Sequence, residues 1–345
     1  MSFEDICFKS EPNFKYKGII KDKSECLASA YQYDCYKDKN GEIYLISPFF
    51  DIERPELTNY HISLITLKDN KEVSKLKGHK DRVINVRYFQ DPYTNDDYLI
   101  SSDRKNNIIV WNLQNFSKIV DININYNALI YSVLLIFDSN EIYAVSSSLS
   151  DTDSTKVFEV GNPNYIINIQ GTSIFFPVYL LLYWYNSKKE VHNIIQCGKN
   201  KILISEFPDN EIYHSFTSDE EHSYNYGGIV FKNKGRDLLA VSAAYGLIQI
   251  YNLEYKEVFI KLELENVFLY SIVKWNDNYL LINDCLNKSI IILDIKDSFQ
   301  VKNKIECPEM YFDRFIKKVE HPLYGESILS VSLYGKIRIF INENK

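Results

Sequence analysis

The sequence lacks any apolar stretch long enough to cross a membrane. The longest, from Ile174 to Tyr185, falls well short of the roughly 20 residues that a spanning helix needs. The first 13 residues include Glu4, Asp5 and Glu11 and contain no apolar segment of the kind found in signal peptides. We therefore expect a soluble protein that is neither exported nor bound to membranes and that resides in the cytoplasm.

An excess of positive charge is also missing. The chain carries a net charge of -7 at pH 7 and has a pI of about 5.5. Binding to a phosphate backbone requires clustered Lys and Arg side chains. General affinity for nucleic acids or for anionic membranes is therefore not expected.

Motifs that carry catalytic or metal chemistry are scarce. The six cysteines form no Cys-x-x-Cys pair, and the six histidines do not show the spacing of metal ligands. Phosphate-binding glycine loops and the Gly-x-Ser-x-Gly elbow are missing. The string from Asp151 to Thr155 fits the Asp-x-Asp-x-Thr pattern of haloacid-dehalogenase-like phosphatases, but it lies in an expected turn without the alternating strands and helices of such enzymes. We predict no metal, no cofactor and no enzymatic activity.

Large residues that favour sheets are abundant. The chain contains 27 Tyr and 20 Phe but only 2 Met, and aromatic residues pack well on pleated surfaces. Hydrophobic residues make up 46% and charged residues 25% of the chain, as in ordinary folded domains. Sustained helical periodicity is not found. These features predict an all-β chain that is folded throughout.

A six-residue, β-rich segment recurs along the chain, with a large residue in fourth place in all copies but one. The copies are Ile62–Leu67, Ile108–Leu113, Thr155–Val160, Ile202–Phe207, Ile248–Leu253, Ile290–Ile295 and Ile337–Asn342. They start 46, 47, 47, 46, 42 and 47 residues apart, close to the period of about 40–45 residues of propeller blades. We predict a single seven-bladed β-propeller. A two-sheet sandwich, the alternative, would not explain the seven-fold recurrence.

Each period contains four expected strands, and the last period lacks its fourth. The strands are clearest in the second copy: Arg82–Phe89, Tyr98–Ser102, Asn107–Leu113 and Ser117–Ile122. The segment Phe14–Ile20 reads like the fourth strand Ser74–His79, so an N-terminal strand is expected to complete the last blade and leave no open edge. This predicts an N-terminal arm of residues 1–13 and a propeller domain of residues 14–345.

One blade resembles those of WD-repeat proteins. The resemblance is carried by Gly78-His79, Ser101-Ser102-Asp103 and Trp111-Asn112-Leu113. In that family a His, a second-strand Ser or Thr, a turn Asp and a third-strand Trp form a hydrogen-bonded network. The resemblance assigns this structural network to His79, Ser101, Asp103 and Trp111. The spacing from Asp103 to Trp111 is longer than is usual in the family, Asn112 replaces its Asp, and the other blades keep little of the motif.

The resemblance also implies a function, that of a non-catalytic module, monomeric by itself, that binds protein or peptide partners. The usual contact surface is the face carrying the loops before the first strands and between the second and third strands, termed here the loop face. Aromatic and arginine side chains on it that the turns do not require are candidates for partner contacts. They are Phe50, Tyr60, Arg104, Tyr245 and Tyr334. Two alternatives stay open: a recognition or regulatory subunit of a larger complex, such as a ubiquitin ligase or cytoskeletal assembly, and a propeller enzyme.

Overall fold

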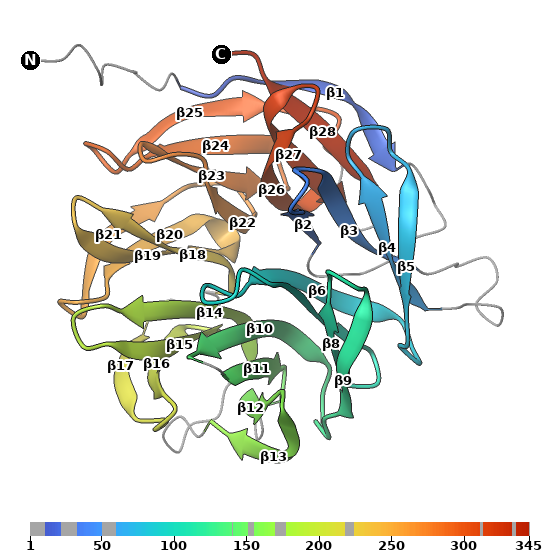
Figure 1. Cartoon of the computed structure of the whole chain (residues 1–345). Helices are drawn as coiled ribbons and strands as arrows, with labels where there is room; N and C mark the ends of the chain where they lie inside the picture. The colour runs from blue at the N-terminus through green and yellow to red at the C-terminus, as the bar shows by residue number, and fades with distance from the viewer. Residues whose placement is uncertain are drawn as a thin grey trace, which may run out of the picture.

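The chain folds into seven four-stranded antiparallel sheets arranged around a central axis (Figure 1). The computed structural model describes residues 11–21, 33–49, 60–139, 141–150, 155–169, 177–217, 224–310, 313–332 and 336–344. In these ranges all elements are strands except one 3-10 turn, η2 (Ala244–Gly246). The predicted all-β, seven-bladed β-propeller is confirmed. No helix in the described ranges has the length and apolar character needed to span a membrane.

The blades follow one another in chain order. Blade one contains β2 (Asp34–Lys37), β3 (Ile43–Phe49), β4 (His61–Thr66) and β5 (Glu72–Lys77), and blade two contains β6 (Val83–Gln90), β7 (Asp97–Asp103), β8 (Asn107–Asn112) and β9 (Ser117–Asn123). Blade three contains β10 (Ile130–Asp138), β11 (Glu141–Ser148), β12 (Thr155–Glu159) and β13 (Asn162–Asn168), and blade four contains β14 (Val178–Asn186), β15 (Val191–Gly198), β16 (Lys201–Phe207) and β17 (Ile212–Thr217). Blade five contains β18 (Asn225–Asn233), β19 (Arg236–Ala243), β20 (Leu247–Asn252) and β21 (Glu257–Glu263), and blade six contains β22 (Leu269–Lys274), β23 (Tyr279–Asp284), β24 (Ser289–Asp294) and β25 (Val301–Glu306). Blade seven contains β26 (Asp313–His321), β27 (Gly325–Ser332), β28 (Ile337–Asn342) and β1 (Phe14–Lys21).

The repeated hexamers form the third strand of every blade. These strands are β4, β8, β12, β16, β20, β24 and β28. The first strand of each blade lies next to the axis, and the fourth lies at the rim (Figure 1). Burial follows this order, because every residue of β4 is buried whereas most residues of the outer strand β9 are exposed.

The apolar core is divided into seven clusters, one between each pair of neighbouring blades. Between blades one and two, Ile62 and Leu64 share a cluster with Leu99 and Trp111. Each sheet therefore buries both faces. This explains why the third strands are nearly continuous apolar runs instead of alternating polar and apolar residues.

The first and last described strands close the ring in one sheet. β1 pairs antiparallel with β28, with Phe14 opposite Asn342. The backbone N–H of Asn13 donates to Oδ1 of Asn342 at 3.0 Å. The Phe14 ring packs edge-on against Trp275 of blade six, with ring centroids 5.0 Å apart. The predicted closure by an N-terminal strand is confirmed.

Six inner strands share an irregularity next to their first residue. The pairing of β6, β10, β14, β18, β22 and β26 with the second strand of the blade shifts register there. The second residues of these strands are Ile84, Tyr131, Tyr179, Tyr226, Tyr270 and Arg314. A β-bulge re-aims the side chain it carries. Since every inner strand starts on the loop face, all six positions lie at that end of the channel.

Removing residues 1–22 deletes β1, so we expect it to destabilise the protein and promote aggregation. Loss of buried Phe14 alone should cost about 3–5 kcal/mol, and β28 becomes an open edge. Thermal denaturation and size-exclusion chromatography measure both effects. Removing residues 1–10 keeps β1 and serves as the control. Equal melting temperatures for the 1–22 deletion and the full chain would argue against closure by β1.

Candidate functional site

Four buried side chains of blade two form a hydrogen-bonded network. His79 precedes β6, and its Nε2 lies 2.7 Å from Ser101 Oγ while its Nδ1 lies 3.0 Å from Asp103 Oδ2. Trp111 donates its indole N–H to Ser101 Oγ at 2.8 Å. The structure thus brings together all four residues that the resemblance assigned to a network.

Ser101 is the centre of this network. Its Oγ accepts the indole N–H of Trp111, faces His79 Nε2 and lies 3.3 Å from the carbonyl oxygen of Ile109, while Nδ1 of His79 faces Asp103. The second oxygen of Asp103 accepts the backbone N–H groups of Lys105 and Asn107 at 2.9 and 3.1 Å. The side chains of His79 and Asp103 are both 0% exposed. The network therefore holds strands and turns together and offers no surface to a ligand.

Other blades make comparable connections with different residues. In blade six, Asp284 accepts the backbone N–H of Phe268 at 3.2 Å and pairs with Lys304 at 3.0 Å. In blade seven, Asp313 pairs with Arg338 at 2.6 Å. Hydrogen bonds and ion pairs thus connect strands and loops in blades that have lost the sequence motif.

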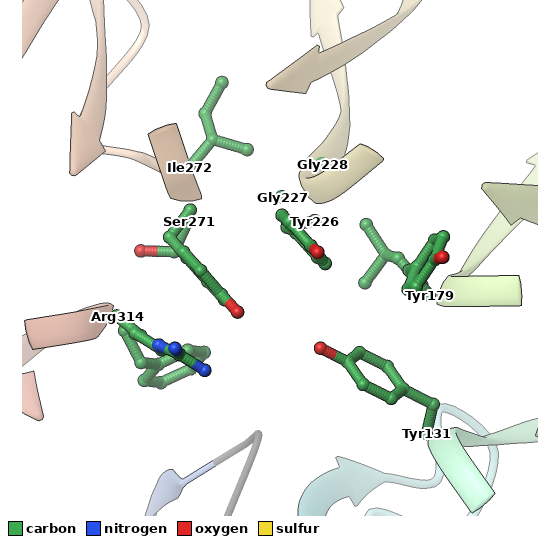
Figure 2. Close-up of a pocket in the computed structure, with 11 residues that line it drawn as sticks. Tyr131, Tyr179, Tyr226, Gly227, Gly228, Ser271, Ile272 and Arg314 are labelled. Atoms are coloured by element: carbon green, nitrogen blue, oxygen red, sulfur yellow. The ribbon is translucent and has the colours of Figure 1, made fainter. Parts of the chain in front are cut away.

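A pocket of about 80 Å³ opens at the loop-face end of the channel. Five of its lining residues occupy the bulged second position of an inner strand: Tyr131, Tyr179, Tyr226, Tyr270 and Arg314. We call this the tyrosine pocket. In Figure 2, Tyr131, Tyr226 and Arg314 converge on the pocket from different blades, with the Tyr131 hydroxyl and the Arg314 guanidinium directed inward. Blades three to seven thus each contribute one residue from the same place in the repeat.

The aromatic rings of the tyrosine pocket contact one another in a continuous series. Tyr131 meets Tyr179 edge-on at a centroid distance of 5.6 Å, and Tyr179 meets Tyr226 at 5.3 Å. Tyr226 stacks on Tyr270 at 4.6 Å with nearly parallel planes. The Arg314 guanidinium lies 4.8 Å from the Tyr270 centroid. These contacts restrict the rings, so the shape of the pocket is largely set before any ligand binds.

A glycine in the lining of the pocket permits the stacking of Tyr226 on Tyr270. A Cβ at Gly227 would lie 2.5 Å from Ser242 Oγ and 2.7 Å from the backbone oxygen of Tyr270. Any larger residue would push β18 away from β22. The close approach of these two inner strands therefore requires glycine at this position.

Tyr245, one of the predicted partner residues, extends the aromatic series onto the surface. It lies in η2 with a φ of 65° and is 65% exposed. Its ring contacts Phe268 at 5.5 Å, and Phe268 in turn stacks on Tyr270 at 5.9 Å. Left-handed backbone is unusual for a bulky residue, and such positions cluster at functional sites.

Neither Tyr245 nor the predicted partner residues Arg104 and Tyr60 line the tyrosine pocket itself. Arg104 is exposed in the turn between β7 and β8, where its backbone N–H donates to the carbonyl of Arg82 at 3.0 Å. Tyr60 is partly buried and directly precedes β4. Phe50 and Tyr334 lie outside the described residues.

Sequence reasoning missed the four tyrosines of the pocket. Their signal lies in the first strands, where Tyr recurs as the second residue in blades three to six. An alignment based on the hexamers of the third strands does not use it. A second alignment anchored on the first strands would have found this column.

A larger cavity of about 370 Å³ lies in the channel next to the tyrosine pocket. The two share Leu180, Gly228, Ile272 and Phe315. The charged residues of the cavity are Asp34, Arg87 and Lys317. Lys317 pairs with Asp34 at 2.6 Å, and Arg87 donates to the carbonyl of Leu181 at 2.9 Å. The lining thus holds two cations and one carboxylate.

Both cations of this cavity are charged. Burial acts to lower the pKa of Lys317, but the charge and hydrogen bond of Asp34 outweigh it, so the pKa is raised overall. Burial lowers the pKa of Arg87 against the opposing effect of Asp34. A guanidinium stays protonated even so. Among the described residues, the lining of this cavity is therefore net positive in a chain whose total charge is negative.

A search for metal sites and comparisons with known proteins gave no further indication of function. In the described part of the chain, no three His, Cys, Asp or Glu side chains lie close enough together to hold a metal ion. No protein-family model matches the sequence, and no curated protein matches it significantly. Fold and local geometry are therefore the basis for a functional proposal.

Replacing Trp111 with Ala should destabilise the protein by about 3–5 kcal/mol, because the indole is 1% exposed and fills the space between blades one and two. Trp111→Phe keeps most of the packing but removes the donor to Ser101, and should cost about 1–3 kcal/mol. Urea denaturation measures both. Tyr93→Ala, at a 56% exposed residue of the same blade, should be nearly neutral. Unchanged stability of Trp111→Ala would show that the network does not hold the blade.

Proposed function

We propose that the chain is a non-catalytic protein-interaction module of the WD-repeat type, and that a protein or peptide partner binds its loop face over the tyrosine pocket. The fold supports this, since propellers commonly serve as interaction scaffolds. The hydrogen-bonded network of His79, Ser101, Asp103 and Trp111 supports the likeness to WD repeats.

The proposal rests mainly on a continuous series of aromatic rings that extends from the protein surface to the channel. It runs from exposed Tyr245 through Phe268 to the rings of the tyrosine pocket. Tyrosine offers a large contact area with a polar tip and loses little side-chain entropy on binding. Residues of this type dominate the energetics of protein interfaces. A partner side chain inserted among these rings would gain both apolar contact and hydrogen bonds.

The double variant Tyr226→Leu/Tyr245→Asn tests this proposal. Leucine keeps apolar volume at a partly buried position, and asparagine accepts the left-handed backbone of residue 245. We expect partners to bind about thirtyfold more weakly or to be lost, as for a hot spot of about 2 kcal/mol. Quantitative affinity purification of tagged protein from its own cells measures this.

Tyr255→Asn is the matched control. Tyr255 is 70% exposed and follows β20, whereas Tyr245 precedes it, so the two lie at opposite ends of the same strand. The control should retain the partners of the unmodified protein. Circular dichroism and melting curves establish that both variants are folded. A folded double variant with an unchanged set of partners would place binding elsewhere on the propeller.

A further inference from the structure

Arg314 is the charged member of the tyrosine pocket. It occupies the bulged position of β26 that tyrosine occupies in blades three to six. Within the described residues it forms no ion pair, and its guanidinium contacts the face of Tyr270. Asp313, its neighbour in sequence, is already paired with Arg338. The guanidinium therefore retains donors for a ligand.

A second polar donor lies in the same pocket. The hydroxyl of Tyr226 makes no hydrogen bond to any described residue. Burial and the neighbouring tyrosines raise the pKa of Tyr226, although Arg314 opposes this, so the hydroxyl stays protonated and can donate. A neutral phenol and a guanidinium both donate hydrogen bonds, and neither brings negative charge into the pocket.

The channel beyond the pocket adds positive charge of its own. Arg87 and Lys317 face one carboxylate, Asp34. The cavity that holds them shares four lining residues with the tyrosine pocket. Charges in a partly desolvated site are weakly screened, so this excess adds to the attraction that Arg314 exerts on an anion.

We infer that the tyrosine pocket binds an oxyanion, a carboxylate or phosphate, presented by a peptide segment of the partner and paired with Arg314. This inference rests on the proposed function and specifies the chemistry of its partner. Arg314 is a planar donor suited to bidentate binding of either group. The space of about 80 Å³ exceeds the 10–15 Å³ or so that one water requires, and it accommodates one such group. The rings of Tyr226 and Tyr270 pack against the carbon atoms that carry it.

The aromatic rings alone would point to a different ligand. Tyrosine faces attract quaternary ammonium groups through cation–π contacts. Arg314 already lies over the face of Tyr270 and would repel a second cation in the same small space. The charge of the pocket therefore favours anions over cations.

Three probes that share a phenyl ring test this inference: phenyl phosphate, phenylacetate and phenyltrimethylammonium. Each is titrated by ligand-observed NMR into the full chain and into two variants. Arg314→Gln removes the guanidinium from the pocket. Arg236→Gln is the matched control, because Arg236 also lies over an aromatic ring, Phe259, but belongs to the opposite end of blade five.

We expect both anions to bind the unmodified chain and the Arg236→Gln variant equally, and to bind Arg314→Gln at least about tenfold more weakly. The anion that binds more tightly identifies which of the two groups, carboxylate or phosphate, the partner presents to Arg314. Preferential binding of phenyltrimethylammonium, equal anion binding by both variants, or no anion binding at all would overturn the inference. If Tyr226→Leu/Tyr245→Asn loses its partners while Arg314→Gln keeps them, the proposed function stands and the oxyanion site does not.

Discussion

Every blade of this propeller buries both faces against its neighbours, and the rest of the structure depends on that requirement. Seven interfaces hold seven apolar clusters, so displacing one sheet would expose two of them. Polar groups enclosed by such packing must find partners inside the protein. The network around His79 and the pair of Asp313 with Arg338 meet this condition in different blades with different chemistry.

The tyrosine pocket follows from the same repeated architecture. It needs no inserted loop, because it uses one backbone position of the inner strand in five successive blades. Convergence of those strands at the axis brings residues from distant parts of the sequence into contact. Tyr131 and Arg314, for example, are far apart in the chain yet line one small opening (Figure 2). Variation at this column of the repeat changes the chemistry of the opening and leaves the blade packing in place.

The architecture was readable from the sequence because the period of the third strands is set by packing. The position of Ile108 and Ile248 is buried in the blades and holds isoleucine in all copies but the one that begins with Thr155, so the hexamer recurs even where the WD motif does not. The blade-two network was readable through its resemblance. Tyr245 was selected for its place in a turn, and its role in partner binding stays a prediction. The pocket tyrosines were not found, because a bulge moves them out of the regular alternation and only the fold brings their rings together. Arg314 was not found either, because the sequence does not show that the neighbouring Asp313 pairs with Arg338 instead.

The pairing of β1 with β28 also sets an order of events during synthesis. Asn13 and Asn342 are 329 positions apart in sequence, yet they share a hydrogen bond. Six blades can form from consecutive segments as the chain emerges, whereas β1 has no partner until β28 has been made. Contacts this distant in sequence form late because their loop-closure entropy is large. Among the described strands, β1 is thus made long before its partner, and it stays unpaired until β28 follows.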